Sequence, residues 1–112
     1  MASQLSKIKE SDIQSAICEY LEAKRHCFFR LNNIPAVYSV GGQMRFRKLP
    51  KFTPRGLPDI VVILDGEFLG LEVKRPKTYQ SPEQKAFQAH VEAHKGKYAV
   101  VRSIDDVIAL GL

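Results

Sequence analysis

Two apolar stretches joined by the dipeptide Asp65-Gly66 constrain the fold of this 112-residue chain more than any other feature. The first stretch, 59–64, reads Asp-Ile-Val-Val-Ile-Leu, and the second, 67–74, reads Glu-Phe-Leu-Gly-Leu-Glu-Val-Lys. Asp-Gly between two apolar runs is typical of a two-residue β-hairpin turn, because such turns need residues that tolerate a positive φ angle. The sequence therefore predicts an antiparallel strand pair over 59–74.

The register of this hairpin predicts which side chains share one face of the sheet. If Leu64 faces Glu67, counting back along both strands sets Asp59 directly opposite Glu72. Strand alternation aims Lys74 to the same face. Facing carboxylates about 5 Å apart repel one another, and a hard cation such as Mg²⁺ or Mn²⁺ would offset this because it binds carboxylate oxygens. Spacing alone leaves open an ordinary surface cluster of charges.

Further segments on both sides of the hairpin carry signals of regular structure. Apolar residues at i, i+3, i+4, i+7 and i+8 from position 13 predict a helix. Ser-Pro-Glu-Gln over 81–84 supplies an N-cap, a proline at the first helical position and a capping-box glutamine. The expected elements are a helix over 10–22, a strand over 27–31, an exposed loop or short hairpin over 32–57, the hairpin over 59–74, a helix over 81–95, a strand over 98–101 and a short helix after Ser103. This order predicts one α/β domain, 1–112, with a central mixed sheet flanked by helices.

Composition limits the classes of function. Lys and Arg outnumber Asp and Glu by 17 to 12, and the net charge of +5 favours polyanionic partners. The two cysteines do not form the dense framework of a small secreted domain, so we expect a reducing, cytoplasmic setting. Residues 1–10 do not resemble a signal peptide. No stretch approaches the roughly 20 apolar residues that span a bilayer, so no membrane association is expected.

Two residues have both a structural and a functional interpretation. Glu10 falls on the apolar arc of the first predicted helix, where it is either a first-turn glutamate favoured by the helix dipole or part of a metal site. Gln84 completes a capping box, yet its helix begins only a short loop after Lys74. Both interpretations stay open for each residue.

An ordered set of motifs resembles a known family. Pro58-Asp59 followed by Glu72-Val73-Lys74 has the form of the PD-(D/E)XK nuclease motif, and the wider frame is similar to the VRR-NUC branch of that superfamily. The resemblance covers Glu10-Ser-Asp-Ile-Gln14, Arg30, Gly56-Leu-Pro-Asp59, Glu72-Val-Lys-Arg-Pro76, Ser81-Pro-Glu-Gln84, Val100-Val-Arg-Ser103 and Asp105-Asp106-Val107. The short motif is common by itself, whereas the ordered set is specific.

The resemblance implies a restriction-endonuclease-like αβββαβ core and a Mg²⁺- or Mn²⁺-dependent endonuclease acting on DNA, without a nucleotide cofactor. It implies metal ligands at Glu10, Asp59, Glu72 and Val73, and catalytic roles for Asp59, Glu72, Lys74 and Gln84. It also implies a similarity to Holliday junction resolvases, proteins of DNA repair and recombination that act as homodimers, and a phage or bacterial origin. A nuclease for flaps or other branched DNA, and a non-catalytic DNA-binding module, are the alternatives.

Basic residues gather in the segment that leads to Asp59. Phe46 and Phe52 lie between them in the sequence, and Gly and Pro interrupt the segment. Such a segment could lie along phosphates and would then bind in a salt-dependent way, whereas a solvated loop without a partner is the alternative. The expected nucleic-acid contacts are Arg30, Arg45, Arg47, Lys48, Lys51, Arg55, Arg75 and Lys77.

Overall fold

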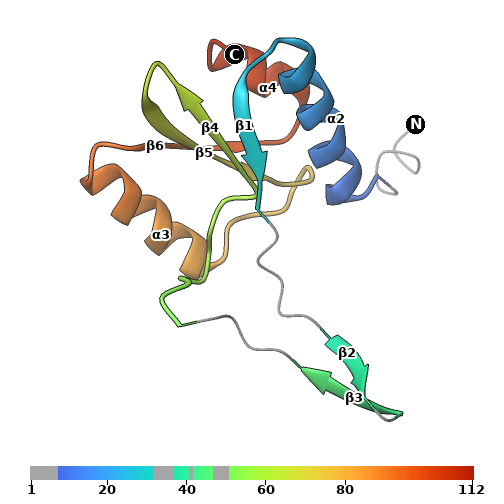
Figure 1. Ribbon diagram of the computed structural model, residues 1–112. Coiled ribbons are helices and arrows are strands. Elements are labelled where there is room, and N and C mark those ends of the chain that lie inside the picture. The colour runs from blue at the N-terminus through green and yellow to red at the C-terminus, as the bar shows by residue number, and fades with distance from the viewer. Residues whose placement is uncertain (1–7, 32–36, 41, 47–50) are drawn as a thin grey trace.

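The computed structural model describes residues 8–31, 37–40, 42–46 and 51–112, and its elements follow the predicted order (Figure 1). These elements are α2 (Glu10–Ala23), β1 (Cys27–Arg30), β2 (Val37–Val40), β3 (Gln43–Phe46), β4 (Ile60–Leu64), β5 (Glu67–Val73), α3 (Pro82–Ala93), β6 (Lys97–Val101) and α4 (Ile104–Ala109). Four strands form the main sheet in the order β1-β4-β5-β6. The β5–β6 pair is parallel and the other two pairs are antiparallel, so the sheet is mixed, as predicted.

The hairpin of β4 and β5 has the predicted turn and register. Asp65 and Gly66 have φ angles of 51° and 81°, the two positive values that a tight hairpin turn requires. Leu64 pairs with Glu67 at the turn. Because the register is the predicted one, continuing it by one pair beyond the last residues of the ladder brings Asp59 to the level of Glu72.

The two faces of the sheet are covered differently. One face carries the apolar core, in which side chains of β4, β5 and β6 pack against α2 and α4. The core residues are Ile17, Leu21, Ile60, Val62, Leu69, Leu71, Val73, Val101, Val107 and Leu112. On the other face α3 contacts β6, and Figure 1 shows α3 on the opposite side of the sheet from α2 and α4. Because α3 has no fully buried residue, this second face is the more open one.

The ends of α3 follow from local chemistry. Ser81 caps the helix, since its hydroxyl accepts a hydrogen bond of 3.2 Å from the Gln84 N–H. At the other end the residue with a positive φ angle is Lys95, at 71°, rather than Gly96. Gly96 is needed for space instead, because a Cβ atom there would lie 2.7 Å from Val91 Cγ1.

The segment between β1 and β4 contains a second, two-stranded sheet, in which Val40 pairs with Gln43. The expectation of a loop or short hairpin is therefore met by a hairpin, which extends away from the main sheet in Figure 1. Arg45 belongs to β3, whereas the predicted contact residues Arg47 and Lys48 lie outside the described residues. Within the described part of the chain, no helix has the length and apolar character needed to cross a membrane.

Candidate active site

Backbone and side-chain hydrogen bonds fix Asp59 just before β4. Its N–H donates to the Leu71 carbonyl at 3.0 Å, and its own carbonyl accepts a bond of 2.8 Å from the Leu31 N–H. The Asp59 backbone is therefore held between β5 and the end of β1. The side chain is fixed as well, since Oδ2 accepts a bond of 2.7 Å from the backbone N–H of Val73. The position of this carboxylate is thus set by the sheet itself.

Glu72 is a buried carboxylate with a donor on each oxygen. The residue is only 1% exposed, and the other fully buried side chains in the described part of the chain are uncharged. The Tyr98 hydroxyl donates to Oε1 at 2.5 Å, and Gln84 Nε2 donates to Oε2 at 2.7 Å. Burial of a carboxylate is costly unless its oxygens are hydrogen bonded, and here both of them are.

Gln84 serves the helix and the site with one side chain. Its Oε1 accepts a bond of 2.8 Å from the Ser81 N–H, which completes the capping box, while its Nε2 donates to Glu72. The capping-box interpretation of Gln84 is therefore confirmed, and the same side chain also contacts Glu72. The cap fixes the rotamer of Gln84, so the start of α3 determines where the amide meets Glu72.

Burial raises the pKa of both carboxyl groups, and repulsion by neighbouring carboxylates adds to the shift of Glu72. Burial, assisted by the neighbouring carboxylates of Asp59 and Glu10, raises the pKa of Glu72 to about 7. Burial also raises the pKa of Asp59, against the Val73 hydrogen bond and the nearby charge of Lys74, which lower it. The charge of Lys74 likewise lowers the pKa of Glu72. The two carboxylates and the ammonium therefore lie close enough to interact electrostatically, as the register predicted.

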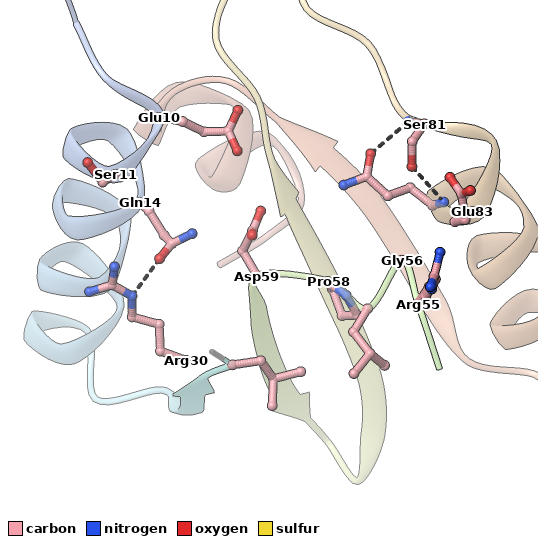
Figure 2. Close-up of a pocket in the computed structure, with 13 residues that line it drawn as sticks. Glu10, Ser11, Gln14, Arg30, Arg55, Gly56, Pro58, Asp59, Ser81 and Glu83 are labelled. Atoms are coloured by element: carbon pink, nitrogen blue, oxygen red, sulfur yellow. Dashed lines mark hydrogen bonds between the residues drawn. The ribbon is translucent and has the colours of Figure 1, made fainter. Parts of the chain in front are cut away.

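A cavity of about 990 Å³ opens beside Asp59, between the N-terminal ends of α2 and α3. Figure 2 shows the carboxyl groups of Glu10 and Asp59 pointing into it from two different elements. The N-terminal ends of both helices carry partial positive charge, which favours an anionic ligand here. The lining residues are Glu10, Ser11, Gln14, Arg30, Leu31, Arg55, Gly56, Leu57, Pro58, Asp59, Ser81, Glu83 and Gln84.

The structure separates the predicted basic residues into two groups. Arg30 and Arg55 line the cavity, and Arg30 Nε donates to Gln14 Oε1 at 2.5 Å. Arg75 and Lys77 are exposed just after β5, outside the cavity lining, and the Lys51 ammonium lies 5.1 Å from the centroid of the Phe52 ring. Lys74 is partly buried and likewise lies outside the lining.

Sequence reasoning did not identify Tyr98, Gly70 and Gly56 as residues of the site. Tyr98 contacts Glu72 because β6 pairs with β5 in parallel, with Gly70 opposite Tyr98. No local pattern in the sequence reveals that pairing. Gly56 has a φ angle of 80°, and a Cβ atom there would lie 2.7 Å from the Gln84 N, so its backbone packs against the first turn of α3. The available signal was its place at the start of the motif Gly56-Leu-Pro-Asp59.

The donor atoms of the site suit a hard divalent cation. Asp59 and Glu72 offer carboxylate oxygens, the ligands that Mg²⁺ and Mn²⁺ prefer, and a cation would offset both the burial of the Glu72 charge and its repulsion by Asp59, which raise the pKa of Glu72. Among the described residues, no three His, Cys, Asp or Glu side chains come close enough together to hold a metal ion. Mg²⁺ usually keeps several water ligands and takes only one or two carboxylates, so this donor set fits it.

Comparison with solved structures gives matches over nearly the whole chain. One similar structure, described as "VRR_NUC domain", is 25% identical with a TM-score of 0.61, and the match covers 90% of this chain and 91% of that chain. Another, described as "VRR_NUC domain protein", is 17% identical with a TM-score of 0.60, covering 92% of this chain and 84% of that chain. No family model and no curated protein matches the sequence.

Proposed function

The chain has the fold of VRR-NUC domains, a nuclease-domain family, as its sequence predicted, and we propose that it is a metal-dependent DNA endonuclease. We further propose that it acts on branched DNA, with four-way junctions cut by a homodimer. The reaction is hydrolysis of a phosphodiester bond, in which water attacks phosphorus and the ester oxygen departs.

One observation carries the proposal. Asp59, just before β4, and Glu72, in the adjacent strand β5, both lie close enough to Lys74 for its charge to lower their pKa values, and Asp59 lines a cavity together with Arg30 and Arg55. A surface cluster without function would be solvated, whereas Glu72 is buried and hydrogen bonded to Tyr98 and Gln84. Its burial raises the pKa of the Glu72 carboxyl group. Perturbed carboxyl groups beside a cavity are typical of functional sites.

Asp59 and Glu72 would hold Mg²⁺ or Mn²⁺, with Glu10 and the main chain at Val73 as further candidate ligands. The bound ion would supply Lewis-acid polarisation of the phosphate and activation of water. Lys74 would orient the attacking water or neutralise charge on the phosphorus oxygens. Gln84 keeps the Glu72 carboxylate in place, because its amide is already fixed by the cap of α3.

The surroundings of the site favour a polyanionic substrate. Arg30 and Arg55 line the cavity, and the N-terminal ends of two helices border it. Phe52, which is 91% exposed, precedes Arg55 by three residues on the segment that enters the site. An exposed aromatic ring next to basic side chains is suited to contact with an unstacked base.

A panel of DNA substrates tests the proposed function. Linear duplex, flap and four-way junction DNA are incubated with protein in excess, with Mg²⁺ or Mn²⁺, using wild type, Lys74→Ala and Lys97→Ala. We expect cleavage of branched DNA by wild type and a loss of about 100-fold or more with Lys74→Ala. Lys97→Ala is the matched control, because Lys97 is exposed and paired with Glu67 on a distant part of β6 and β5.

Intact DNA in every reaction would contradict the nuclease assignment and leave a non-catalytic DNA-binding module on the same fold. Sedimentation separates the finer proposals. Two symmetric nicks in a junction require two sites, and one chain of this size carries one. A monomer at working concentration that nicks flaps but not junctions would overturn the homodimer proposal and favour a flap nuclease.

A further inference from the structure

We propose that Tyr98 is a positioning residue of the active site, whose hydroxyl holds the Glu72 carboxylate in the orientation that binds the cation. This inference rests on the proposed function. The inference extends the proposed function, because it assigns a role to a residue other than Asp59, Glu72, Lys74 and Gln84. Tyr98 acts through Glu72 rather than on the substrate.

The hydrogen-bond geometry leaves Glu72 little freedom to rotate. Tyr98 binds Oε1 at 2.5 Å and Gln84 binds Oε2 at 2.7 Å, and Glu72 itself is only 1% exposed. A carboxylate has about four lone-pair positions, two for each oxygen. The two donors use one position on each oxygen, so each keeps a further lone pair for a cation. Without the phenol, only the Gln84 contact would fix the plane of the group.

The Tyr98 ring is itself tightly located. A Cβ atom on Gly70 would lie 3.0 Å from Pro58 Cγ and 3.1 Å from Tyr98 Cδ2, so the absent side chain is what gives both rings their room. The Phe87 ring of α3 packs at 6.5 Å from Tyr98 in an edge-on arrangement. Pro58 directly precedes Asp59. The packing that locates the phenol is therefore continuous with the segment that carries the other carboxylate.

The strand register brings the phenol to the correct face. In the parallel pair of β5 and β6, Gly70 faces Tyr98 and Glu72 faces Val100. Tyr98 and Glu72 are thus diagonal neighbours on the face that α3 covers, away from the apolar core. A hydroxyl at this diagonal position reaches a carboxylate two residues along the adjacent strand.

A Tyr98→Phe variant separates positioning from simple stabilisation, because it removes the hydroxyl and keeps the ring. Mn²⁺ is titrated into the folded protein by calorimetry, without DNA. We expect the Kd for Mn²⁺ to rise about 10-fold or more, the range found when a partner of a metal ligand is lost. Tyr20→Phe is the matched control, since the Tyr20 hydroxyl donates to the Leu112 carbonyl at 2.8 Å, away from the site. Its Kd should equal that of wild type.

An unchanged Kd for Tyr98→Phe, with wild type binding Mn²⁺, would overturn this inference and leave the proposed function standing. Wild type that binds no Mn²⁺ would contradict the proposed function and this inference with it. If Tyr98→Phe does not fold, Phe87→Leu decides the question, because it removes the ring that packs against Tyr98 and keeps the Tyr98 hydroxyl. We expect weaker Mn²⁺ binding with unchanged DNA binding in EDTA, and wild-type Mn²⁺ affinity would contradict the inference.

Discussion

Asp59 Oδ2 accepts a hydrogen bond of 2.7 Å from the backbone N–H of Val73, the residue between Glu72 and Lys74. The Asp59 side chain is therefore also an acceptor that the sheet requires. Asp59→Asn should keep this bond through its amide oxygen while removing a charge that repels Glu72.

We expect Asp59→Asn to melt at the wild-type temperature or above it in EDTA, and Asp59→Ala to be about 1–3 kcal/mol less stable because it leaves the Val73 N–H without its acceptor. Thermal and urea unfolding of the two variants measure the difference. Equal losses of stability in both would show that the Val73 contact is not what the side chain contributes.

The pKa of Glu72 predicts a dependence of metal-free stability on pH. The pKa lies at about 7 in the folded protein against an ordinary 4.5, so between these values the folded state binds more protons than the unfolded state. The free energy of unfolding then falls as pH rises from about 4.5 to 7, and Glu72 adds no further change above that window.

Glu72→Gln removes this titration. Urea unfolding in EDTA at pH 5 and pH 7.5 should show a fall in wild type that exceeds the fall in Glu72→Gln by about 2 kcal/mol, since one pKa unit corresponds to roughly 1.4 kcal/mol. Carboxyl groups away from the site contribute equally to both proteins. Parallel profiles in the two would contradict the assigned pKa.

Arg55 lines the cavity and should contact a phosphate of the bound DNA. Arg55→Gln should weaken DNA binding in EDTA and reduce the slope of log Kd against log salt concentration by about one, the change expected for one lost phosphate contact. Fluorescence anisotropy over a range of salt concentrations measures the slope. Arg25→Gln is the control, because Arg25 is exposed after α2 and outside the cavity lining, and an equal reduction there would contradict the contact.

Gly56 lies in the segment before β4, and its backbone packs against the start of α3. Gly56→Ala combines a left-handed φ angle of 80° with steric overlap against the Glu83 carbonyl and the Gln84 N, whereas Gly66→Ala meets φ of 81° with open space around it. Left-handed strain alone costs roughly 1–2 kcal/mol. In urea unfolding, Gly56→Ala should lower the free energy of unfolding by about 1–3 kcal/mol more than Gly66→Ala does, because steric overlap adds to backbone strain. Equal losses of stability in the two variants would exclude the contact with α3.

Local signals in the sequence predicted much of the fold and the central pair of carboxylates. The Asp65-Gly66 turn determines the register of β4 and β5, and a register determines which side chains face each other. Ser81 and Gln84 predicted the start of α3 in the same way, because capping depends on residues three positions apart. These are short-range constraints that a single sequence contains.

Contacts between distant segments could not be predicted in this way. The hydrogen bond from Tyr98 to Glu72 depends on β6 lying beside β5, and that pairing follows from how α3 crosses the sheet. The packing of Gly56 on the first turn of α3 likewise joins segments almost 30 positions apart in numbering. Both depend on tertiary packing, which leaves no periodic pattern in the sequence.

Melting of the wild-type protein in EDTA and in Mn²⁺, beside Glu72→Gln, is the most direct test of the claim that Asp59 and Glu72 form a cation site. At Mn²⁺ concentrations about 100 times the Kd, binding to the folded state adds roughly 2.7 kcal/mol to its stability. The account predicts that wild type melts several degrees higher in Mn²⁺ and that Glu72→Gln shows little or no shift. A wild-type melting temperature that Mn²⁺ leaves unchanged, or an equal rise in Glu72→Gln, would contradict it.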